Sequence, residues 1–183
     1  MTNKLLKSDE RDGLRTWIEI DRGAIKHNLA VFRSLIDKRV KLMSVVKSNA
    51  YGHGLYDFTV AIDKFGIDWF GVDSLIEGLA LRKEGIKKPI LVLGFTLPER
   101  IEEAVDNDVT ISVSNFEILT KLAKRKSTKS IKIHIKIDTG MHRQGFAVSE
   151  LMKVCKSIVE ANKKGANIIV EGMYTHFAAA KNP

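Results

Sequence analysis

The feature that most constrains the fold is a repeated switch between two hydrophobic periods along the chain. Short apolar runs typical of β-strands alternate with segments whose apolar residues recur every three or four positions, as in amphipathic helices. The strand-like runs are residues 42–46, 68–72, 89–94, 109–113, 131–138 and 168–176. Because helix-like segments separate them, consecutive strands are expected to pair in parallel through right-handed crossovers. The sequence therefore predicts an α/β protein.

Local signals place further elements around these runs. Residues 16–20 also look like a strand, and the spacing of Ile25, Leu29, Phe32 and Ile36 predicts a helix after them. Residues 1–15 mix both signs of charge without an apolar core, so we expect a flexible tail there and no signal peptide.

Serine and glycine mark the predicted ends of helices. Ser74 with Glu77, and Ser114 with Glu117, fit the capping box that opens a helix. Glycine adopts the left-handed conformation at little cost and therefore often ends a helix. The glycines at such positions are Gly66, Gly85 and Gly165.

Parallel strands that are covered on both faces are normally apolar throughout. In the run at 131–138, by contrast, apolar and polar residues alternate. One face carries Ile131, Ile133, Ile135 and Ile137, and the other carries Lys132, His134, Lys136 and Asp138. A (β/α)8 barrel explains this pattern, because helices cover its outside while inner residues near the carboxyl ends of the strands can serve a ligand. We therefore expect Lys136 and Asp138 to face the interior and the isoleucines to face the helices. An open doubly wound sheet is the alternative.

The number of strands is too small for a complete barrel. Eight strands usually require ~250 residues, whereas this chain has 183. We expect residues 16–183 to form a partial TIM-type barrel of about six of the eight strands. It would be incomplete at the C-terminus and would lack a C-terminal β domain.

Charge and hydropathy narrow the classes of partner. The chain has 30 basic and 22 acidic residues, a net charge of +8. Its densest basic cluster, at 121–132, is expected to be a solvated helix face that includes Lys121, Lys124, Arg125 and Lys126. No zinc-finger or RNA-binding signature accompanies it, so we expect no nucleic-acid partner. No apolar run reaches ~18 residues, so we expect no membrane partner.

Cysteine and histidine content argues against disulfide and metal chemistry. Cys155 is the single cysteine, and its apolar setting predicts a helical core position. Four histidines, His53, His134, His142 and His176, lack the H-x₃₋₅-H spacing of a zinc site, so we expect no metal. His134 is expected to be a hydrogen-bonded interior residue.

Lys47 is the leading candidate for covalent chemistry. It ends the first strand-like run of the predicted sheet, so its amine should project at the barrel mouth where such folds place active sites. Gly52 and Gly54 allow close backbone approach to an anion, and Tyr51 offers a phenolic donor. A desolvated lysine beside a phosphate site suits covalent capture of pyridoxal phosphate, since burial favours the neutral amine.

Three segments resemble motifs of the pyridoxal-phosphate-dependent alanine racemase family. VVKSNAYGHG at 45–54 resembles the cofactor-lysine motif, HIKIDTGMHRQGF at 134–146 the substrate-side motif, and EGMYTHFAAA at 171–180 the later strand with a cofactor-stacking histidine. The segments occur in the family's order, which makes the match specific. Small departures are Ser48, Gln144 and Lys181, where alanine, leucine and aspartate are usual.

The resemblance implies a role for each matched residue. The cofactor aldehyde would be attached to Lys47, with Tyr51 donating to the phosphate and His176 lying against the pyridine ring. Arg143 would steady the catalytic tyrosine and the substrate carboxylate. Lys136 matches a lysine that can be carbamylated, and the carbamate would hold Arg143.

The resemblance also implies the reaction. Lys47 would serve one face of the substrate α-carbon and a tyrosine from the C-terminal domain of the partner subunit the other, interconverting L-alanine and D-alanine by two bases. The enzyme would be a cytoplasmic homodimer that makes D-alanine for bacterial cell-wall peptidoglycan. This chain lacks that domain, so we expect it to be inactive alone. Two alternatives remain open: a racemase for serine, lysine or arginine, and an inactive pyridoxal-phosphate-binding remnant.

Overall fold

The computed structural model describes residues 13–180, so most of the predicted tail at 1–15 lies outside the described residues. The strands are β1 (Met43–Val45), β2 (Trp69–Val72), β3 (Ile90–Val92), β4 (Thr110–Val113), β5 (Ile131–Asp138), β6 (Phe146–Ala147) and β7 (Ile168–Tyr174). The α-helices are α1 (Arg22–Ser34), α2 (Lys47–Tyr51), α3 (Leu55–Asp63), α4 (Leu75–Lys83), α5 (Ile101–Asp106), α6 (Phe116–Ala123) and α7 (Leu151–Lys163). Two short 3₁₀ helices, η2 (Pro98–Arg100) and η3 (Val148–Glu150), precede α5 and α7.

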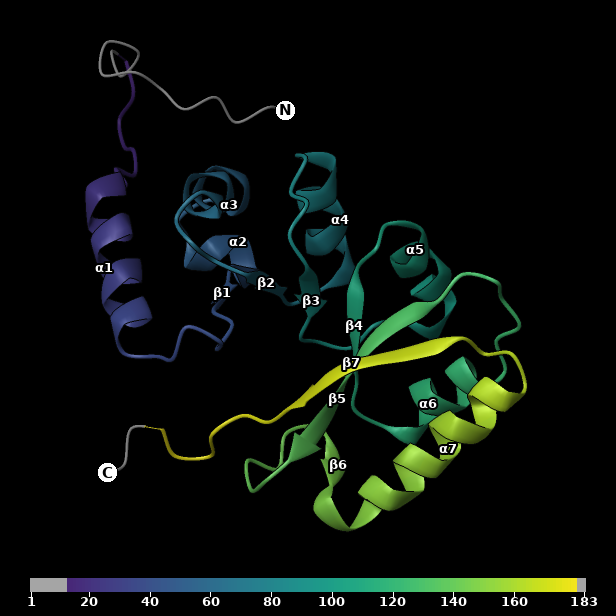
Figure 1. The fold of residues 1–183 in the computed structure, drawn as a ribbon. Coiled ribbons are helices and arrows are strands. Elements are labelled where there is room, and N and C mark those ends of the chain that lie inside the picture. Colours follow the sequence, from purple (N-terminus) through teal and green to yellow (C-terminus); the bar gives the residue numbers. More distant parts are fainter. Residues whose placement is uncertain (1–12, 181–183) are drawn as a thin grey trace.

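The strands form one parallel sheet, which confirms the predicted α/β class. β1 to β5 pair in chain order, and β7 then pairs with β5. The short β6 was not predicted and joins only the carboxyl end of β5, through Ile137 opposite Phe146 and Asp138 opposite Ala147. Helices connect the strands on one side of this sheet, and β7 runs along β5 (Figure 1).

The sheet is curved like the wall of a barrel. The rings of Trp69 on β2 and His134 on β5 have centroids 5.3 Å apart, although β3 and β4 lie between their strands. In a flat sheet, strands three steps apart would be separated by roughly 14 Å. The ring contact therefore requires a concave face, on which His134 also lies near the ring of Tyr174 from β7, at a centroid distance of 6.3 Å.

The two faces of β5 point where the alternation predicts. Ile131, Ile133 and Ile135 are buried in the hydrophobic cluster that the helices share with the sheet. Lys136 faces the concave side, where its Nζ atom lies 4.5 Å from the centroid of the Tyr174 ring. A β-bulge between Ile133 and His134 shifts the pairing of β5 with β7.

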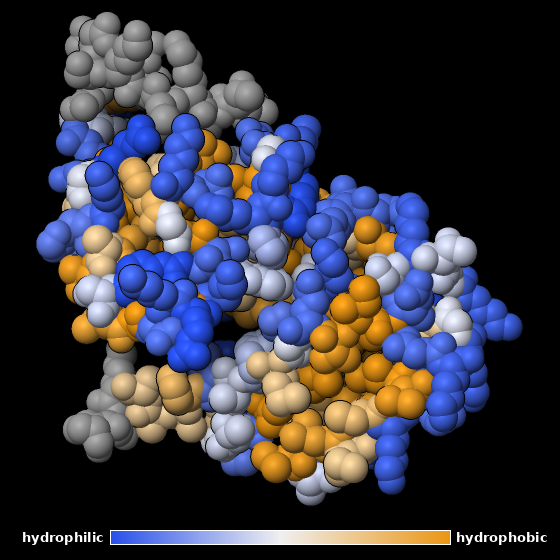
Figure 2. Space-filling view, in the orientation of Figure 1, coloured by the Kyte–Doolittle hydropathy of each residue, from blue (hydrophilic) through white to orange (hydrophobic). Residues whose placement is uncertain are grey.

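Apolar side chains are also exposed at the edge of the sheet. Among the described residues, β1 and β7 each pair with one strand only. Ile169, Val170 and Met173 of β7 are exposed, and Figure 2 shows apolar atoms gathered over β7 and the adjacent helices. No helix within residues 13–180 is long and apolar enough to cross a membrane.

Two local predictions about secondary structure were wrong. Residues 16–20 form no strand, because no described segment pairs with them, and Trp17 and Ile18 are exposed there. The cap of α6 is Asn115 rather than Ser114, and its side chain accepts from the backbone N–H of Ile118 at 3.0 Å. The Ser74–Glu77 capping box of α4 is present as predicted.

Two burial predictions and one hydrogen-bond prediction also need correction. Cys155 is exposed, because α7 buries the stripe of Val154, Ile158 and Ala161, and Cys155 lies about 100° of helix rotation off it. Arg125 is buried rather than solvated, since it binds Glu102. His134 is interior, but its Nε2 atom has no hydrogen-bond partner among the described residues.

Candidate functional site

Polar residues gather at the carboxyl ends of the strands. Lys47 follows β1, Asp73 follows β2, Arg143 follows β5 and His176 follows β7. All strands are parallel, so these ends lie at the same edge of the curved sheet, where barrel enzymes bind their substrates. The predicted position of Lys47 at this mouth is therefore the position it occupies.

The segment α2 is a left-handed turn directly after Lys47 rather than a right-handed α-helix. Ser48, Asn49, Ala50 and Tyr51 have φ values of 53°, 56°, 51° and 55°. Each non-glycine residue in this conformation costs ~1–2 kcal/mol. Such backbone persists only where the surroundings hold it, and it is concentrated at functional sites. The sequence SNAY does not predict four successive residues in the left-handed region, because asparagine is the only one of the four that favours it.

Lys47 is paired with an acid from the next strand. Its Nζ atom lies 3.3 Å from Oδ1 of Asp73, and the side chain is partly exposed. The prediction that Lys47 is desolvated is therefore wrong. Glu77, in the first turn of α4, accepts the backbone N–H groups of Ser48 and Asp73, each at 2.7 Å. Sequence reasoning assigned Glu77 only to the helix cap and did not identify Asp73.

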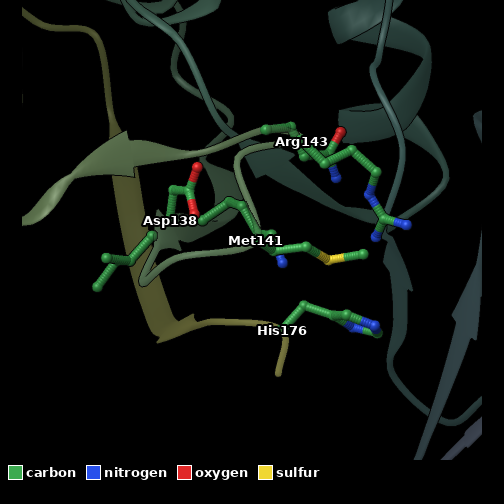
Figure 3. A pocket seen from close by; sticks show the side chains of 7 residues that line it. Asp138, Met141, Arg143 and His176 are labelled. Atoms are coloured by element: carbon green, nitrogen blue, oxygen red, sulfur yellow. The ribbon is translucent and has the colours of Figure 1, made fainter. Parts of the chain in front are cut away.

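A small pocket brings together three of the predicted site residues. It is lined by Lys136, Ile137, Asp138, Met141, Arg143, Gln144 and His176. Figure 3 shows Met141, Arg143 and His176 extending in the same direction, with the sulfur of Met141 between the guanidinium and the imidazole. Lys47 and Tyr51 do not line this pocket, and 63% of Tyr51 is exposed.

Lys136 is buried in that pocket, and no acidic side chain within residues 13–180 is in contact with it. Only 3% of it is exposed. Burial lowers the pKa of its ammonium group, the nearby charge of Arg143 lowers this pKa further, and Asp138 raises it. The Tyr174 ring offers a cation–π contact, and the Tyr174 hydroxyl is in turn hydrogen-bonded to Ser112 Oγ at 2.7 Å. The environment therefore disfavours the charged form of Lys136.

Asp138 holds the loop that carries Arg143. Its Oδ1 atom accepts the backbone N–H groups of Gly140 at 2.9 Å and His142 at 3.0 Å. These bonds lower the pKa of the Asp138 carboxyl. Gly145, at the end of this loop, packs directly against the backbone of β5. A side chain would not fit there, because a Cβ atom would lie 2.7 Å from the Asp138 nitrogen.

Arg143 and His176 have polar groups available for a ligand. Within residues 13–180, Arg143 forms no hydrogen bond or ion pair with another described residue, and both side chains are exposed. A guanidinium fits a carboxylate in a planar, bidentate arrangement. The exposed Arg143 guanidinium is therefore available to bind the carboxylate of a small molecule.

The chain matches one family over most of its length. Residues 20–183 match the family described as alanine racemase, N-terminal domain. The chain is 42% identical over 173 residues to alanine racemase 1 of Caldanaerobacter subterraneus subsp. tengcongensis, covering 92% of this chain and 44% of that protein. It is 44% identical over 171 residues to the alanine racemase of Methanococcus maripaludis, covering 91% of this chain and 44% of that protein.

A solved structure shares the fold. The crystal structure of alanine racemase from Bacillus anthracis with bound L-Ala-P aligns with a TM-score of 0.81 at 35% identity, covering 91% of this chain and 43% of that one. This likeness confirms the partial barrel. The chain spans about 44% of the length of the two curated relatives named above. By sequence and by fold, it belongs to the alanine racemase family, within which it corresponds to the N-terminal domain.

Proposed function

We propose that this chain is the cofactor-binding part of a pyridoxal-phosphate-dependent enzyme that interconverts L-alanine and D-alanine. The observation that carries the proposal is the placement of Lys47, Arg143 and His176 at the same edge of one parallel sheet. The relatives named above are alanine racemases, which supports alanine as the substrate.

The residues present suit this cofactor. Lys47 supplies a primary amine for the aldehyde, and its partial exposure leaves it accessible. Tyr51, in the left-handed turn beyond it, is exposed and supplies a phenolic donor for the phosphate. His176, at the end of β7, supplies a flat ring for contact with the pyridine. When bound, pyridoxal phosphate supplies a conjugated ring that delocalises the electron pair left at the substrate α-carbon.

The chain's own groups bind the substrate and move the proton. The Arg143 guanidinium binds the substrate carboxylate and fixes which face of the α-carbon is presented. The Nζ atom of Lys47 takes or returns the α-proton on one face. The family resemblance assigns the opposite face to a tyrosine in the C-terminal domain of the partner subunit, so the proposal includes a cytoplasmic homodimer for the whole protein. These 183 residues alone should therefore racemise alanine negligibly.

Carbamylation of Lys136 is a further part of the proposal. Reaction with carbon dioxide requires the neutral amine, and burial together with Arg143 lowers the pKa of Lys136 and so favours that form. A carbamate would replace a positive charge beside Arg143 by a negative one. Repulsion between the two side chains would become attraction, and the carbamate would hold the guanidinium in place.

Covalent capture tests the assignment of Lys47. The chain is incubated with pyridoxal phosphate, the attached cofactor is fixed with borohydride, and the labelled lysine is identified by peptide mapping. We expect label at Lys47 and its loss in Lys47→Arg. Lys41→Arg, at the amino end of the same strand, is the matched control and should label normally. Label on another lysine with Lys47 unmodified contradicts the assignment.

Proton exchange separates the remaining readings. With alanine in deuterated water, Lys47 alone should exchange the α-proton with retention of configuration. Rapid full racemisation by this chain would show that the second base lies within it. Faster exchange of serine, lysine or arginine than of alanine would favour another substrate, and capture of the cofactor without exchange would favour a binding remnant.

A further inference from the structure

Glu77 makes two short hydrogen bonds that its role as a helix cap does not explain. In a capping box, the glutamate binds the N–H of the cap residue of its own helix. Here that bond, from the Ser74 N–H to Glu77 Oε2, is 3.4 Å long. The bonds from the N–H groups of Ser48 and Asp73 are both 2.7 Å. The carboxylate is therefore bound more closely by the ends of two strands than by its own helix.

The two short bonds fix both ends of one ion pair. Ser48 follows Lys47 directly, so the bond to Oε1 holds the backbone that carries the lysine. Oε2 holds the backbone of Asp73, whose carboxylate lies 3.3 Å from Lys47 Nζ. One side chain thus sets the position of the lysine amine and of the acid that faces it.

The left-handed turn needs such a support. Among the described residues, the other hydrogen bonds of residues 48–51 stay within the segment 46–55, including Ala50 N–H to Val46 O at 2.9 Å and Leu55 N–H to Asn49 Oδ1 at 2.9 Å. Within residues 13–180, the bond from Ser48 to Glu77 is the only hydrogen bond that connects this strained turn to a distant element. Strained backbone persists only where neighbouring structure determines it.

We infer that Glu77 is a positioning residue for Lys47: its carboxylate joins the ends of β1 and β2 and so fixes the left-handed turn that aims the lysine amine into the barrel mouth. The inference rests on the proposed role of Lys47 as the lysine that captures the cofactor. Two acceptor oxygens are required, because each accepts a different backbone N–H. Glutamine retains one acceptor and presents an NH₂ group to the other N–H, so it cannot replace glutamate here.

The test compares Glu77→Gln with Glu84→Gln. Glu84 caps the other end of α4, is exposed and has no side-chain partner within residues 13–180, so the same chemical change there is the control. The first readout is amide hydrogen exchange of Ser48 without cofactor. The second is the initial rate at which pyridoxal phosphate, fixed with cyanoborohydride, appears on Lys47 relative to other lysines of the same sample.

We expect Glu77→Gln to lower both the exchange protection of Ser48 and the relative rate at Lys47 by on the order of tenfold to a hundredfold, the cost of misplacing a reactive group by about 1 Å. Glu84→Gln should change neither. Glu77→Asp keeps the charge, but its shorter side chain cannot reach both strand ends, so it should behave like Glu77→Gln. If circular dichroism shows that Glu77→Gln is unfolded, Glu77→Asp takes its place in the test.

Unchanged protection of Ser48 in a folded Glu77 variant overturns the inference, as does lost protection with an unchanged rate at Lys47. Absence of capture at Lys47 in the unmodified chain overturns the proposed function instead. In that case the exchange measurement still decides whether Glu77 fixes the turn.

Discussion

Replacing Lys136 by methionine should stabilise the protein. The lysine is 3% exposed, forms no hydrogen bond with another described residue, and lies near the positive charge of Arg143. Exchanging buried charged groups for apolar ones of similar volume often raises stability by about 1–4 kcal/mol. The lost cation–π contact with Tyr174 offsets about 1–2 kcal/mol of this. Taking the middle of each range, the net gain is about 1 kcal/mol, or a rise in Tm of roughly 2–4 °C for a domain of this size.

The effect has a predicted pH dependence. Because burial lowers the pKa of Lys136, the folded state binds fewer protons than the unfolded state between the lowered pKa and the ordinary value of 10.5. Stability of the unmodified protein therefore rises with pH across this interval. The advantage of Lys136→Met should be full below the lowered pKa and should shrink as pH approaches the ordinary value.

Thermal unfolding in bicarbonate-free buffer, between neutral pH and pH about 10, measures both effects. Lys132→Met is the matched control, because Lys132 lies on the same face of β5 but is partly exposed and paired with Asp108 at 2.7 Å. It should give no gain. A lower Tm for Lys136→Met than for the unmodified protein would refute the reasoning. Adding bicarbonate should stabilise the unmodified protein and leave Lys136→Met unchanged if Lys136 is carbamylated.

Two stability predictions concern other parts of the chain. Gly145→Ala should lower the free energy of unfolding by at least about 2 kcal/mol, because the φ of Gly145 is +126° and a Cβ atom would lie 2.7 Å from the Asp138 nitrogen. Gly85→Ala is the control: a Cβ atom there would meet open space, so the cost in denaturant unfolding should be only about 1 kcal/mol. Arg125→Met should cost about 1–3 kcal/mol, since Arg125 is buried and two backbone carbonyls as well as Glu102 lose their donor. The hydrogen bond from Arg125 lowers the pKa of Glu102. The stability from this pair is therefore present above the ordinary carboxyl pKa and is lost as the pH falls through the lowered value. The stability of Arg125→Met should accordingly decrease less in acid than that of the unmodified protein.

Most strands were predictable because burial on both faces leaves a plain apolar signature. The six runs from 42 to 176 all contain a strand of the sheet. The run at 16–20 has the same local pattern, yet a strand also requires a partner with which to share hydrogen bonds, and local sequence does not reveal one. The cap of α6 shifted by one residue because Asn115 caps a helix as well as serine does.

The candidate site was predictable only where a single residue type suggests the chemistry. Lys47 stands at a strand end beside glycines, and Arg143 and His176 lie in segments that resemble a known family. The contacts of Asp73 and Glu77 could not be predicted, because they depend on two loops that are adjacent only after β1 and β2 pair. Contacts between residues that are distant in the sequence cannot be predicted from local patterns, even when each residue has a recognisable role of its own.

Curvature of the sheet decides whether the two halves of the site can act on one ligand. Lys47 follows β1 and His176 follows β7, the two ends of the strand order, which a flat sheet would hold roughly 24 Å apart. The concave face is packed by Trp69 and His134, whose rings meet across two intervening strands. Gly172 leaves room for this packing, since a Cβ atom there would lie 3.1 Å from the His134 ring. The separation of Lys47 and His176 at the mouth therefore depends on the size of the side chains packed on the concave face as well as on the loops that carry the two residues.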